Sequence, residues 1–335
     1  MEFQFGWTKG SESDSHGYTK SVTNSVSTAF KTELSNYTGG GKFEIYARPQ
    51  SSKPTSFKLV QGEAQYFVRI SNRVGHPDLE KSVSEHLTES SASYNPIILT
   101  KLLSEDDQIL RMDVRPFIDG YHLADLISLV DYEVLLDTLH NLHLSLQKFP
   151  DANHVKANAV DIQNRHHSIH AKYGSSLSLP DQYADLSSLD SVRDAGQKYF
   201  FDLTELPKAQ CLHGQPHAHN ILFDRSSKLP IFIDSETQAY IFSSPEFDYA
   251  YMLQRLVLQF CNRGINEFKK YYERAIEYCD SELLKYFLLQ IDYYNIFSAI
   301  SFIEMGYDIP KSEFIKFEKF YHMTKDILEQ LDAAA

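Results

Sequence analysis

The sequence predicts an α+β protein of two lobes, in which a small antiparallel β lobe with one main helix precedes a larger, mainly helical lobe. Up to residue 118, short apolar segments alternate with polar residues at the period of β-strands. From residue 123 onward, apolar residues recur instead at the spacing of helices. The length of 335 residues suits two modest domains or one domain with two lobes.

Five strands and one helix are expected in the first lobe. A glycine run at residues 39–41 marks a flexible turn that leads into the first strand. Pro77 suits the first turn of a helix, which is expected over residues 77–90. The strands are expected at about residues 42–48, 57–60, 66–70, 97–103 and 109–117.

The boundaries of the lobes follow from composition and from one turn dipeptide. Residues 1–30 are expected to form a mobile tail with a short helix near residues 22–30, because Ser, Thr, Lys and Gly dominate there. The Asp-Gly turn at 119–120 marks an expected hinge over residues 119–122. We therefore expect a β-rich first lobe over residues 31–118 and a helical lobe over residues 123–332.

Composition excludes several classes of protein. Apolar residues make up 42% of the chain, which excludes a largely disordered or collagen-like protein. The formal net charge is −13 and no run of Lys or Arg occurs, so nucleic acid is not an expected partner. No apolar run is long enough to span a bilayer, so a membrane is not an expected partner. The three cysteines form no CxxC pair, and their odd number predicts a reducing, cytoplasmic environment.

One β-like segment interrupts the helical lobe at residues 211–236. Apolar residues 221–223 and 231–233 flank a polar turn, which predicts a hairpin with its tip near Ser226 and Ser227. This pairing would place Asn220 opposite Asp234. An amide and a carboxylate on adjacent strands are suitable ligands for Mg²⁺, which fills its remaining positions with phosphate oxygens and water.

The same segment resembles a known family. From His213 to Asn220 the chain reads H-G-Q-P-H-A-H-N, which is similar to the H-G-D-x-x-x-x-N catalytic loop of aminoglycoside phosphotransferases and choline-kinase-like enzymes. Residues 233–236 (I-D-S-E) resemble the I-D-W-E metal-binding segment of the family, and residues 247–250 (F-D-Y-A) resemble its F-D-L-A segment. The resemblance implies a protein-kinase-like fold and phosphoryl transfer from ATP to a small molecule.

The resemblance implies a set of nucleotide-binding residues in the first lobe. The glycine run would cover the phosphates, and Arg69 would reach them. Glu80 would be the helix partner of Arg69, with Glu85 as the second choice. Residues 114–120 resemble the hinge, where adenine would bind. The implied nucleotide-binding residues are Gly39, Gly40, Gly41, Arg69, Glu80, Arg115 and Phe117.

In the helical lobe the resemblance implies that Asn220 and Asp234 bind Mg²⁺. Glu236 is either a further Mg²⁺ ligand or an exposed acid at the strand end. His213 would hold the catalytic loop in place. Asp248 either contacts this loop or caps the helix that starts near residue 249.

Gln215 departs from the family, which has Asp as general base at this position. A Gln amide accepts a hydrogen bond from a hydroxyl group but takes no proton near neutral pH. Losing a general base costs about 10²–10⁴ in rate. Two functions follow: an ATP- and Mg²⁺-dependent phosphotransferase of attenuated activity, acting on a small hydroxylated metabolite or antibiotic-like molecule, or a pseudokinase-type module that binds nucleotide or another ligand.

The histidines leave other possibilities open. His217 is a candidate substitute base, because an unperturbed imidazole has a pKa of about 6.5. His213, His217 and His219 are also spaced to form a metal site with Asp234. A second cluster at residues 166–170 is better explained as a solvated helix face.

Overall fold

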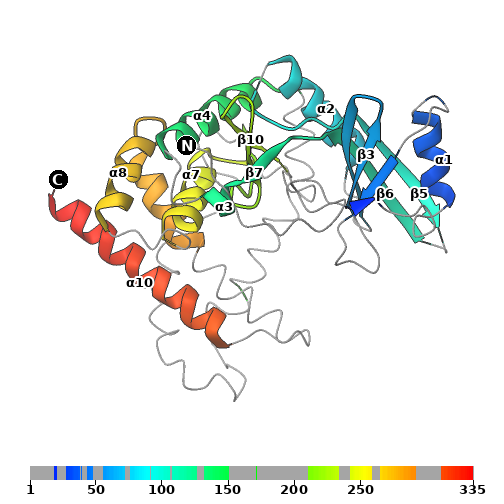
Figure 1. The fold of residues 1–335 in the computed structure, drawn as a ribbon. Coiled ribbons are helices and arrows are strands. Elements are labelled where there is room, and N and C mark those ends of the chain that lie inside the picture. Colours follow the sequence, from blue (N-terminus) through cyan, green and yellow to red (C-terminus); the bar gives the residue numbers. More distant parts are fainter. Residues whose placement is uncertain are drawn as a thin grey trace. The chain divides into compact units, whose positions relative to one another are not determined.

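Two structural units make up the chain in the computed structural model, shown in Figure 1. Residues 1–89 and 95–119 form the first unit, and residues 90–94 and 120–335 form the second. This confirms the expected α+β fold class. The structure describes residues 19–20, 28–37, 39, 44–47, 56–71, 76–90, 92–105, 108–126, 132–150, 171, 210–233, 242–258, 265–291 and 311–334.

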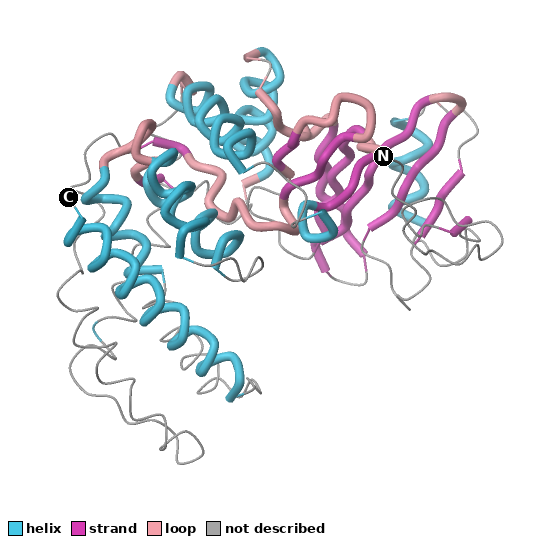
Figure 2. Tube along the Cα trace, turned by 60° about the vertical axis from the view of Figure 1, so that its left-hand side comes forward, coloured by secondary structure: helices cyan, strands magenta, loops and turns pink. Residues whose placement is uncertain are grey.

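An antiparallel sheet of six strands is the centre of the first unit (Figure 2). The expected five strands are present, and a sixth, two-residue strand that was not predicted lies at one edge. The alternating pattern located these strands because one face of the sheet is apolar. The strands are β1 (Thr19–Lys20), β2 (Glu44–Ala47), β3 (Ser56–Gln61), β4 (Ala64–Ser71), β5 (Leu99–Glu105) and β6 (Gln108–Pro116), in the order β1-β2-β3-β4-β6-β5.

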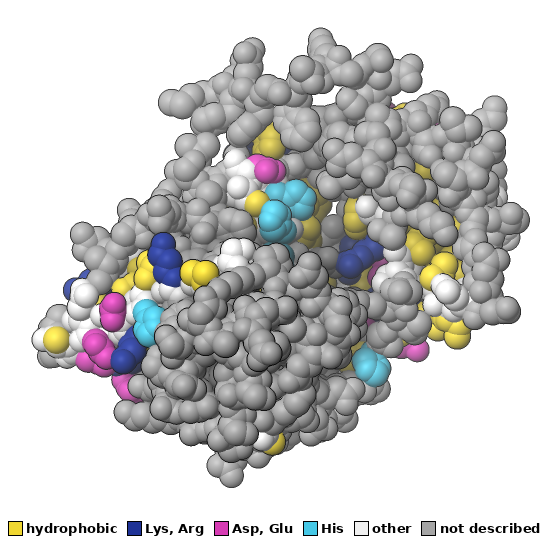
Figure 3. Space-filling view, turned by 90° about the horizontal axis from the view of Figure 1, so that it is seen from below, with side chains coloured by type: hydrophobic (Ala, Val, Ile, Leu, Met, Phe, Trp, Pro, Cys, Tyr) yellow, Lys and Arg dark blue, Asp and Glu magenta, His cyan; other side chains and the backbone are white. Residues whose placement is uncertain are grey.

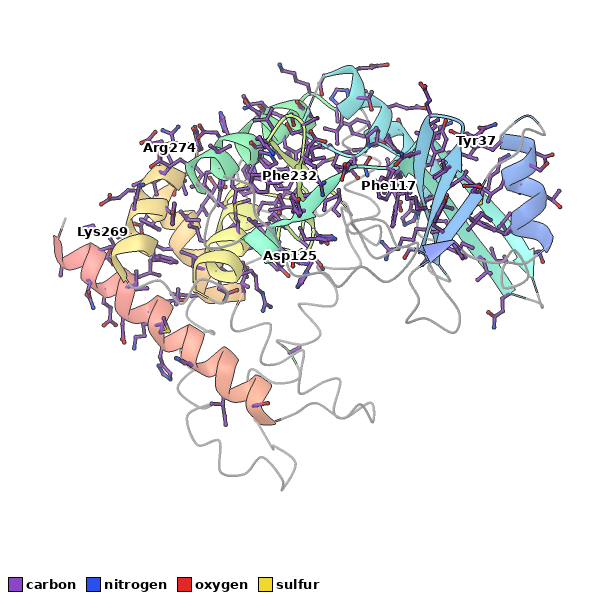
Figure 4. The ribbon with its side chains drawn as sticks, viewed as in Figure 1. Tyr37, Phe117, Asp125, Phe232, Lys269 and Arg274 are labelled. Atoms are coloured by element: carbon purple, nitrogen blue, oxygen red, sulfur yellow. The ribbon has the colours of Figure 1, made fainter. Side chains whose placement is uncertain are left out.

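Helix α1 (Thr28–Tyr37) packs on the apolar face of this sheet. Phe30 is fully buried, and its ring centroid lies 5.4 Å from that of Phe57 on β3. Tyr37, labelled in Figure 4, meets Tyr66 edge-on at 5.6 Å. The helix lies further along the chain than expected. It shares only residues 28–30 with the expected helix. The helix forms at this later position because Phe30, Leu34 and Tyr37 supply its apolar stripe.

Helix α2 (Pro77–Glu89) begins at the expected proline and ends within one residue of the expected boundary. It buries an apolar stripe formed by Leu79, Val83 and Leu87. Glu80 is equally buried, at 1% exposure. A buried carboxylate is costly unless it is paired, so we expect Glu80 to bind a group on the polar face of the sheet.

A three-stranded antiparallel sheet lies in the second unit and consists of β7 (Gly120–His122), β9 (Ile221–Asp224) and β10 (Pro230–Phe232), in the order β10-β9-β7. The expected hinge at 119–122 therefore includes a strand. A Cβ atom at Gly120 would lie 2.4 Å from the carbonyl oxygen of Phe223, so only glycine fits this approach. The Asp-Gly dipeptide was interpreted as a turn, but the glycine serves close packing.

The β9–β10 hairpin is present, but its register differs by one residue from the prediction. Ile221 pairs with Phe232, and the N–H of Ile233 donates to the carbonyl of Asn220 at 2.9 Å. Asn220 therefore lies opposite Ile233, not opposite Asp234. The turn explains the shift, because Lys228 adopts a φ of 60° and its N–H donates to the carbonyl of Asp224.

Helices dominate the rest of the second unit, as expected. The strand pair β8 (Gln210–Cys211) and β11 (Phe242–Ser243) lies among them. No helix in the described part of the chain is long and apolar enough to span a membrane. The helices are α3 (Leu123–Leu126), α4 (Tyr132–Gln147), α7 (Glu246–Met252), the π-helix η4 (Leu253–Leu258), α8 (Ile265–Ala275), residues 281–291 and α10 (Lys311–Ala334).

Candidate functional site

Residues 212–220, which we refer to as the 212–220 loop, connect β8 to β9. Backbone hydrogen bonds fold it tightly: the N–H of His217 donates to the carbonyl of Gln215, and the N–H of Asn220 donates to that of His217, both at 2.8 Å. Gly214 has a φ of 87°, a conformation that other residues rarely adopt. The sequence H-G-Q-P-H-A-H-N thus forms a rigid bend that ends in Asn220.

Asp248 of α7 holds this bend in place through hydrogen bonds. Its carboxylate accepts hydrogen bonds from the backbone N–H groups of His213 and Gly214, each at 2.9 Å, and its side chain is fully buried. His143 of α4 is a third partner, with Nε2 3.0 Å from Oδ2. Asp248 therefore contacts the loop. The capping alternative is wrong, because α7 begins at Glu246 and its N-cap is Pro245.

His213 connects the loop to the end of β10. Its Nε2 lies 3.0 Å from the carbonyl oxygen of Ile233, and its Nδ1 accepts the N–H of Gln215 at 3.3 Å. A carbonyl only accepts, so Nε2 carries the hydrogen and the ring is neutral in this arrangement. Phe232, labelled in Figure 4, packs 5.4 Å from the ring. Both ring nitrogens of His213 are thus used in structure.

Asn220 ends the bend and is hydrogen-bonded to Gln215 within it. The Nδ2 of Asn220 donates to the backbone carbonyl of Gln215 at 3.1 Å, which leaves Oδ1 as the acceptor end of a buried amide. The side chain of Gln215 is half-buried and makes no hydrogen bond with another residue in the described ranges. An oxygen donor held in this way suits a hard cation.

The other two predicted metal ligands, Asp234 and Glu236, lie outside the described residues, as do Gly40 and Gly41. Ile233, which directly precedes Asp234, is hydrogen-bonded to Asn220. Among the residues that the structure describes, no three His, Cys, Asp or Glu side chains are placed to hold a metal ion. The histidine–metal alternative also fails at His213, whose ring nitrogens bond to the backbone.

Figure 3 shows a group of adjoining histidine side chains near the centre of the view. In the second unit the ring centroids of His217 and His219 are 6.0 Å apart, and those of His122 and His219 are 6.4 Å apart. His122 Nδ1 lies 3.1 Å from the carbonyl oxygen of His219, and Tyr251 lies near His217. His122, His217, His219 and Tyr251 thus form one group of neighbouring rings.

In the first unit, the face of the sheet opposite α1 carries charges. Arg111, Asp113 and Arg115 alternate along β6 with the core residues Met112 and Val114, so the three charged side chains share one face. All three are at least nine-tenths buried. A strand with charges at every second position was interpreted only as a strand, and this cluster was not predicted.

Glu80 forms its ion pair with Arg111, whose Nη2 contacts Oε2 of the carboxylate. The Nε of Arg111 donates to Oδ1 of Asp113 at 2.9 Å. Burial raises the pKa of Glu80, and the hydrogen bond and charge of Arg111 act against this rise. Burial acts to lower the pKa of Arg111, but Glu80 and Asp113 outweigh it and raise the pKa.

Three further predicted nucleotide-binding residues, Arg69, Arg115 and Phe117, lie on or beside this charged face. Arg69 of β4 is directly opposite Asp113 of β6 in the ladder. Arg115 donates from Nη1 to the carbonyl oxygen of Asn95 at 2.7 Å. The Nζ of Lys58, on β3, lies 4.4 Å from the ring centroid of Phe117, which is labelled in Figure 4. Aromatic and cationic side chains of the first unit thus lie close together.

Gly39, the described member of the glycine run, ends helix α1. Its φ is 63°, and its N–H donates to the carbonyl oxygen of Asn36 at 3.2 Å. Glycine is the usual residue for this left-handed position after a helix. A Cβ atom there would meet no other atom within 4 Å, so the conformation and not the space requires glycine.

Comparison with solved structures identifies the fold. Choline kinase LicA from Streptococcus pneumoniae aligns at a TM-score of 0.53 and 13% identity, covering 90% of this chain and 99% of the kinase. Aminoglycoside phosphotransferase APH(4)-Ia aligns at a TM-score of 0.58 and 11% identity, covering 91% of this chain and 99% of that enzyme. No family model and no curated protein matches the sequence.

Several of the similar structures contain ligands. LicA was solved with AMP, at a TM-score of 0.56 and 12% identity over 89% of this chain and 98% of LicA. A variant of APH(4)-Ia was solved with ADP and hygromycin B, at a TM-score of 0.57 and 14% identity over 90% of this chain and 98% of the enzyme. The similarities show that this chain has the kinase-like fold of these enzymes.

Proposed function

We propose that this protein binds Mg-ATP and transfers its terminal phosphate to a hydroxyl group of a small metabolite or antibiotic-like molecule. The observation that carries the proposal is the 212–220 loop, whose buried Asn220 sits at the start of a hairpin and whose backbone is held by Asp248. Phosphoryl transfer depends on positioning and charge stabilisation, and a rigid loop between buried anchors supplies the first of these.

In the first unit, Arg69 is the proposed phosphate-binding residue, and Arg115 and Phe117 lie in the proposed adenine-binding segment. On the described strands β3, β4 and β6, four cations and one acid lie on the charged side of the sheet, and a second acid reaches it from α2. The excess of positive charge favours an anionic ligand such as a polyphosphate. The four cations are Lys58, Arg69, Arg111 and Arg115, and the two acids are Glu80 and Asp113.

In the second unit, Asn220 and Asp234 are the proposed Mg²⁺ ligands. A buried amide whose nitrogen is fixed by the Gln215 carbonyl offers its oxygen in one orientation, which fits an oxygen-preferring cation. When bound, Mg²⁺ would neutralise charge on the phosphate oxygens. His213 would keep the chain before Asp234 in place through its hydrogen bond to Ile233.

The acceptor hydroxyl would meet Gln215, which accepts a hydrogen bond but does not remove a proton. His217 is the proposed substitute for the missing base. Its Nδ1 accepts the N–H of His219 at 3.2 Å, so the remaining proton sits on Nε2 in the neutral ring. Proton transfer through His217 would then need the Nδ1 hydrogen bond to break, which predicts slow turnover.

A binding module without efficient transfer is the second candidate, and Gln215 is the observation that favours it. An uncharged side chain in place of Asp removes repulsion against the phosphates and strengthens nucleotide binding. Both candidates share the nucleotide site and differ in whether the phosphate is transferred.

The test combines binding and turnover on the full chain. Millimolar Mg-ATP should raise the melting temperature, because a ligand that binds only the folded state stabilises it. ADP formation with choline or hygromycin B as acceptor, followed by ³¹P NMR of the product, separates the two candidates. Loss of turnover in Asn220→Ala but not in the exposed control Asn141→Ala supports the transferase, whereas absence of any thermal shift contradicts both candidates.

A further inference from the structure

Arg111 is among the most deeply buried large side chains described, with 1% exposure. Its guanidinium contacts two carboxylates, Glu80 from α2 and Asp113 from its own strand, and these acids are also buried. A buried guanidinium is stable only when its charge is matched and its fork is hydrogen-bonded. Arg111 is therefore positioned to join α2 to the sheet.

The carboxylate of Glu80 also forms a hydrogen bond at the start of helix α2. Its Oε1 accepts the backbone N–H of His76 at 3.2 Å, while its own N–H donates to the carbonyl of His76 at 3.0 Å. The side-chain bond caps the first turn of α2 by satisfying the N–H of the residue before the helix, and the backbone bond is the first i→i−4 bond of the helix. The same carboxylate that starts the helix thus binds Arg111, so the start of α2 and the strand β6 are fixed to each other.

The charges follow an alternating order from the helix to the middle of the sheet. Glu80 is followed by Arg111, then Asp113, and then Arg69 directly across the ladder. We propose that Arg111 is the positioning residue that holds α2 on the sheet, and that Arg69 acts on an anionic ligand and is not required to hold the helix. This second half rests on the function proposed above.

The proposal has a consequence for control of the protein. A helix held by a ligand-binding cation would move when the ligand leaves, because the same cation would serve both. A helix held by Arg111 keeps its position in both states. Nucleotide binding should therefore leave the position of α2 on the sheet unchanged, and α2 should not act as a ligand-controlled switch.

A double-mutant cycle read by hydrogen exchange of the α2 amides tests the first half on the full chain without nucleotide. Arg111→Met and Glu80→Gln should each lower protection of α2 at least tenfold. The double variant should be no less protected than Arg111→Met, because Glu80→Gln removes the carboxylate that Arg111→Met leaves buried and unpaired. Arg69→Met and the exposed control Lys101→Met should change protection less than twofold.

Two results would overturn the assignment: Arg69→Met loosening α2 as much as Arg111→Met, or strictly additive effects of Arg111→Met and Glu80→Gln. Should Arg111→Met fail to fold, Arg111→Lys replaces it. A lysine point charge satisfies one carboxylate but not the fork, so an intermediate loss of protection is expected, and unchanged protection counts against the proposal.

Nucleotide titration tests the second half and separates it from the proposed function. Arg69→Met should weaken Mg-ATP binding at least tenfold, and Arg111→Lys should weaken it less than Arg69→Met does. Equal weakening by the two variants would contradict the division of roles. If wild type itself shows no binding, the proposed function fails, while the exchange data on Arg111 and Glu80 still decide how α2 is held.

Discussion

His143 is the residue through which helix α4 reaches the 212–220 loop, because it hydrogen-bonds to Asp248. Its carbonyl also accepts the side chain of Gln210 on β8 at 3.2 Å. We expect His143→Ala to destabilise the protein by about 1–3 kcal/mol, since it removes a hydrogen bond from a fully buried carboxylate. Chemical denaturation measures this loss.

The position of the 212–220 loop should change as well. His143→Asn keeps a donor, and we expect it to retain more nucleotide affinity and more transfer activity than His143→Ala. Asn141→Ala, on the exposed side of the same helix, is the control for helix propensity. Equal stability of His143→Ala and Asn141→Ala would mean that the contact with Asp248 contributes nothing.

Gln215 decides how much chemistry the loop performs. We expect Gln215→Asp to raise phosphate transfer at least tenfold, because a carboxylate both orients the acceptor hydroxyl and accepts its proton. The added negative charge should also weaken binding of ATP. Steady-state kinetics with the acceptor varied measures both effects.

The matched control is Gln215→Asn, which shortens the side chain like Asp but adds no charge. It should not increase the rate. A rate that Asp leaves unchanged would mean that position 215 does not face the acceptor, and His217 would then be the first residue to test in its place.

At the scale of elements, the turn of the β9–β10 hairpin depends on one carboxylate. Oδ1 of Asp224 accepts the N–H groups of Ser226 at 3.1 Å and Ser227 at 2.6 Å. The hydrogen bond from the hydroxyl of Ser226 and these backbone bonds lower the pKa of Asp224 below its ordinary value of 3.8. A lowered carboxyl pKa stabilises the folded state above the ordinary value, and this contribution disappears as the pH falls through the lower, folded value.

We therefore expect wild type and Asp224→Asn to differ by a constant amount in melting temperature at neutral and weakly acidic pH. The difference should narrow as the pH falls below 3.8. Asp326→Asn, at an exposed position of α10, should show no such narrowing. A difference between wild type and Asp224→Asn that is the same at every pH would exclude the carboxylate as the source of turn stability.

Sequence patterns located the first-unit strands and α2 because these elements bury one regular face. The alternation of residues 57–60 and 66–70 marks β3 and β4, and Pro77 marks the start of α2. The Asp-Gly dipeptide at 119–120 predicts a turn, whereas Gly120 packs closely within a strand. A sequence pattern shows the periodicity of a strand or a helix, but it does not show where two backbone segments approach closely.

The candidate site shows the same limit. The 212–220 loop was found from its motif, but the register of its hairpin was wrong by one residue because Lys228 takes a left-handed conformation. Arg111 was missed because a charge in an alternating strand resembles a solvent-facing residue. Arg111 is buried because α2 packs beside β6, and this tertiary contact leaves no local pattern in the sequence.

At the scale of the whole molecule, the proposed function assigns residues of both units to one reaction. Arg69 belongs to the first unit, and Asn220 belongs to the second. If both residues bind Mg-ATP, then substituting either one should reduce the stabilisation that the nucleotide gives to the full chain. This expectation is stronger than a search for activity, because it does not require the acceptor to be known.

Differential scanning fluorimetry with Mg-ATP at about 100 times its Kd measures this, where the ligand stabilises wild type by about 2.7 kcal/mol. A tenfold loss of affinity in Arg69→Met or Asn220→Ala should remove about 1.4 kcal/mol of that gain. The matched controls Lys101→Met and Asn141→Ala should keep all of it. If Arg69→Met alone reduces the shift, the nucleotide uses the first unit only, and Asn220 loses its proposed role as a metal ligand; if neither does, the nucleotide binds elsewhere in the chain.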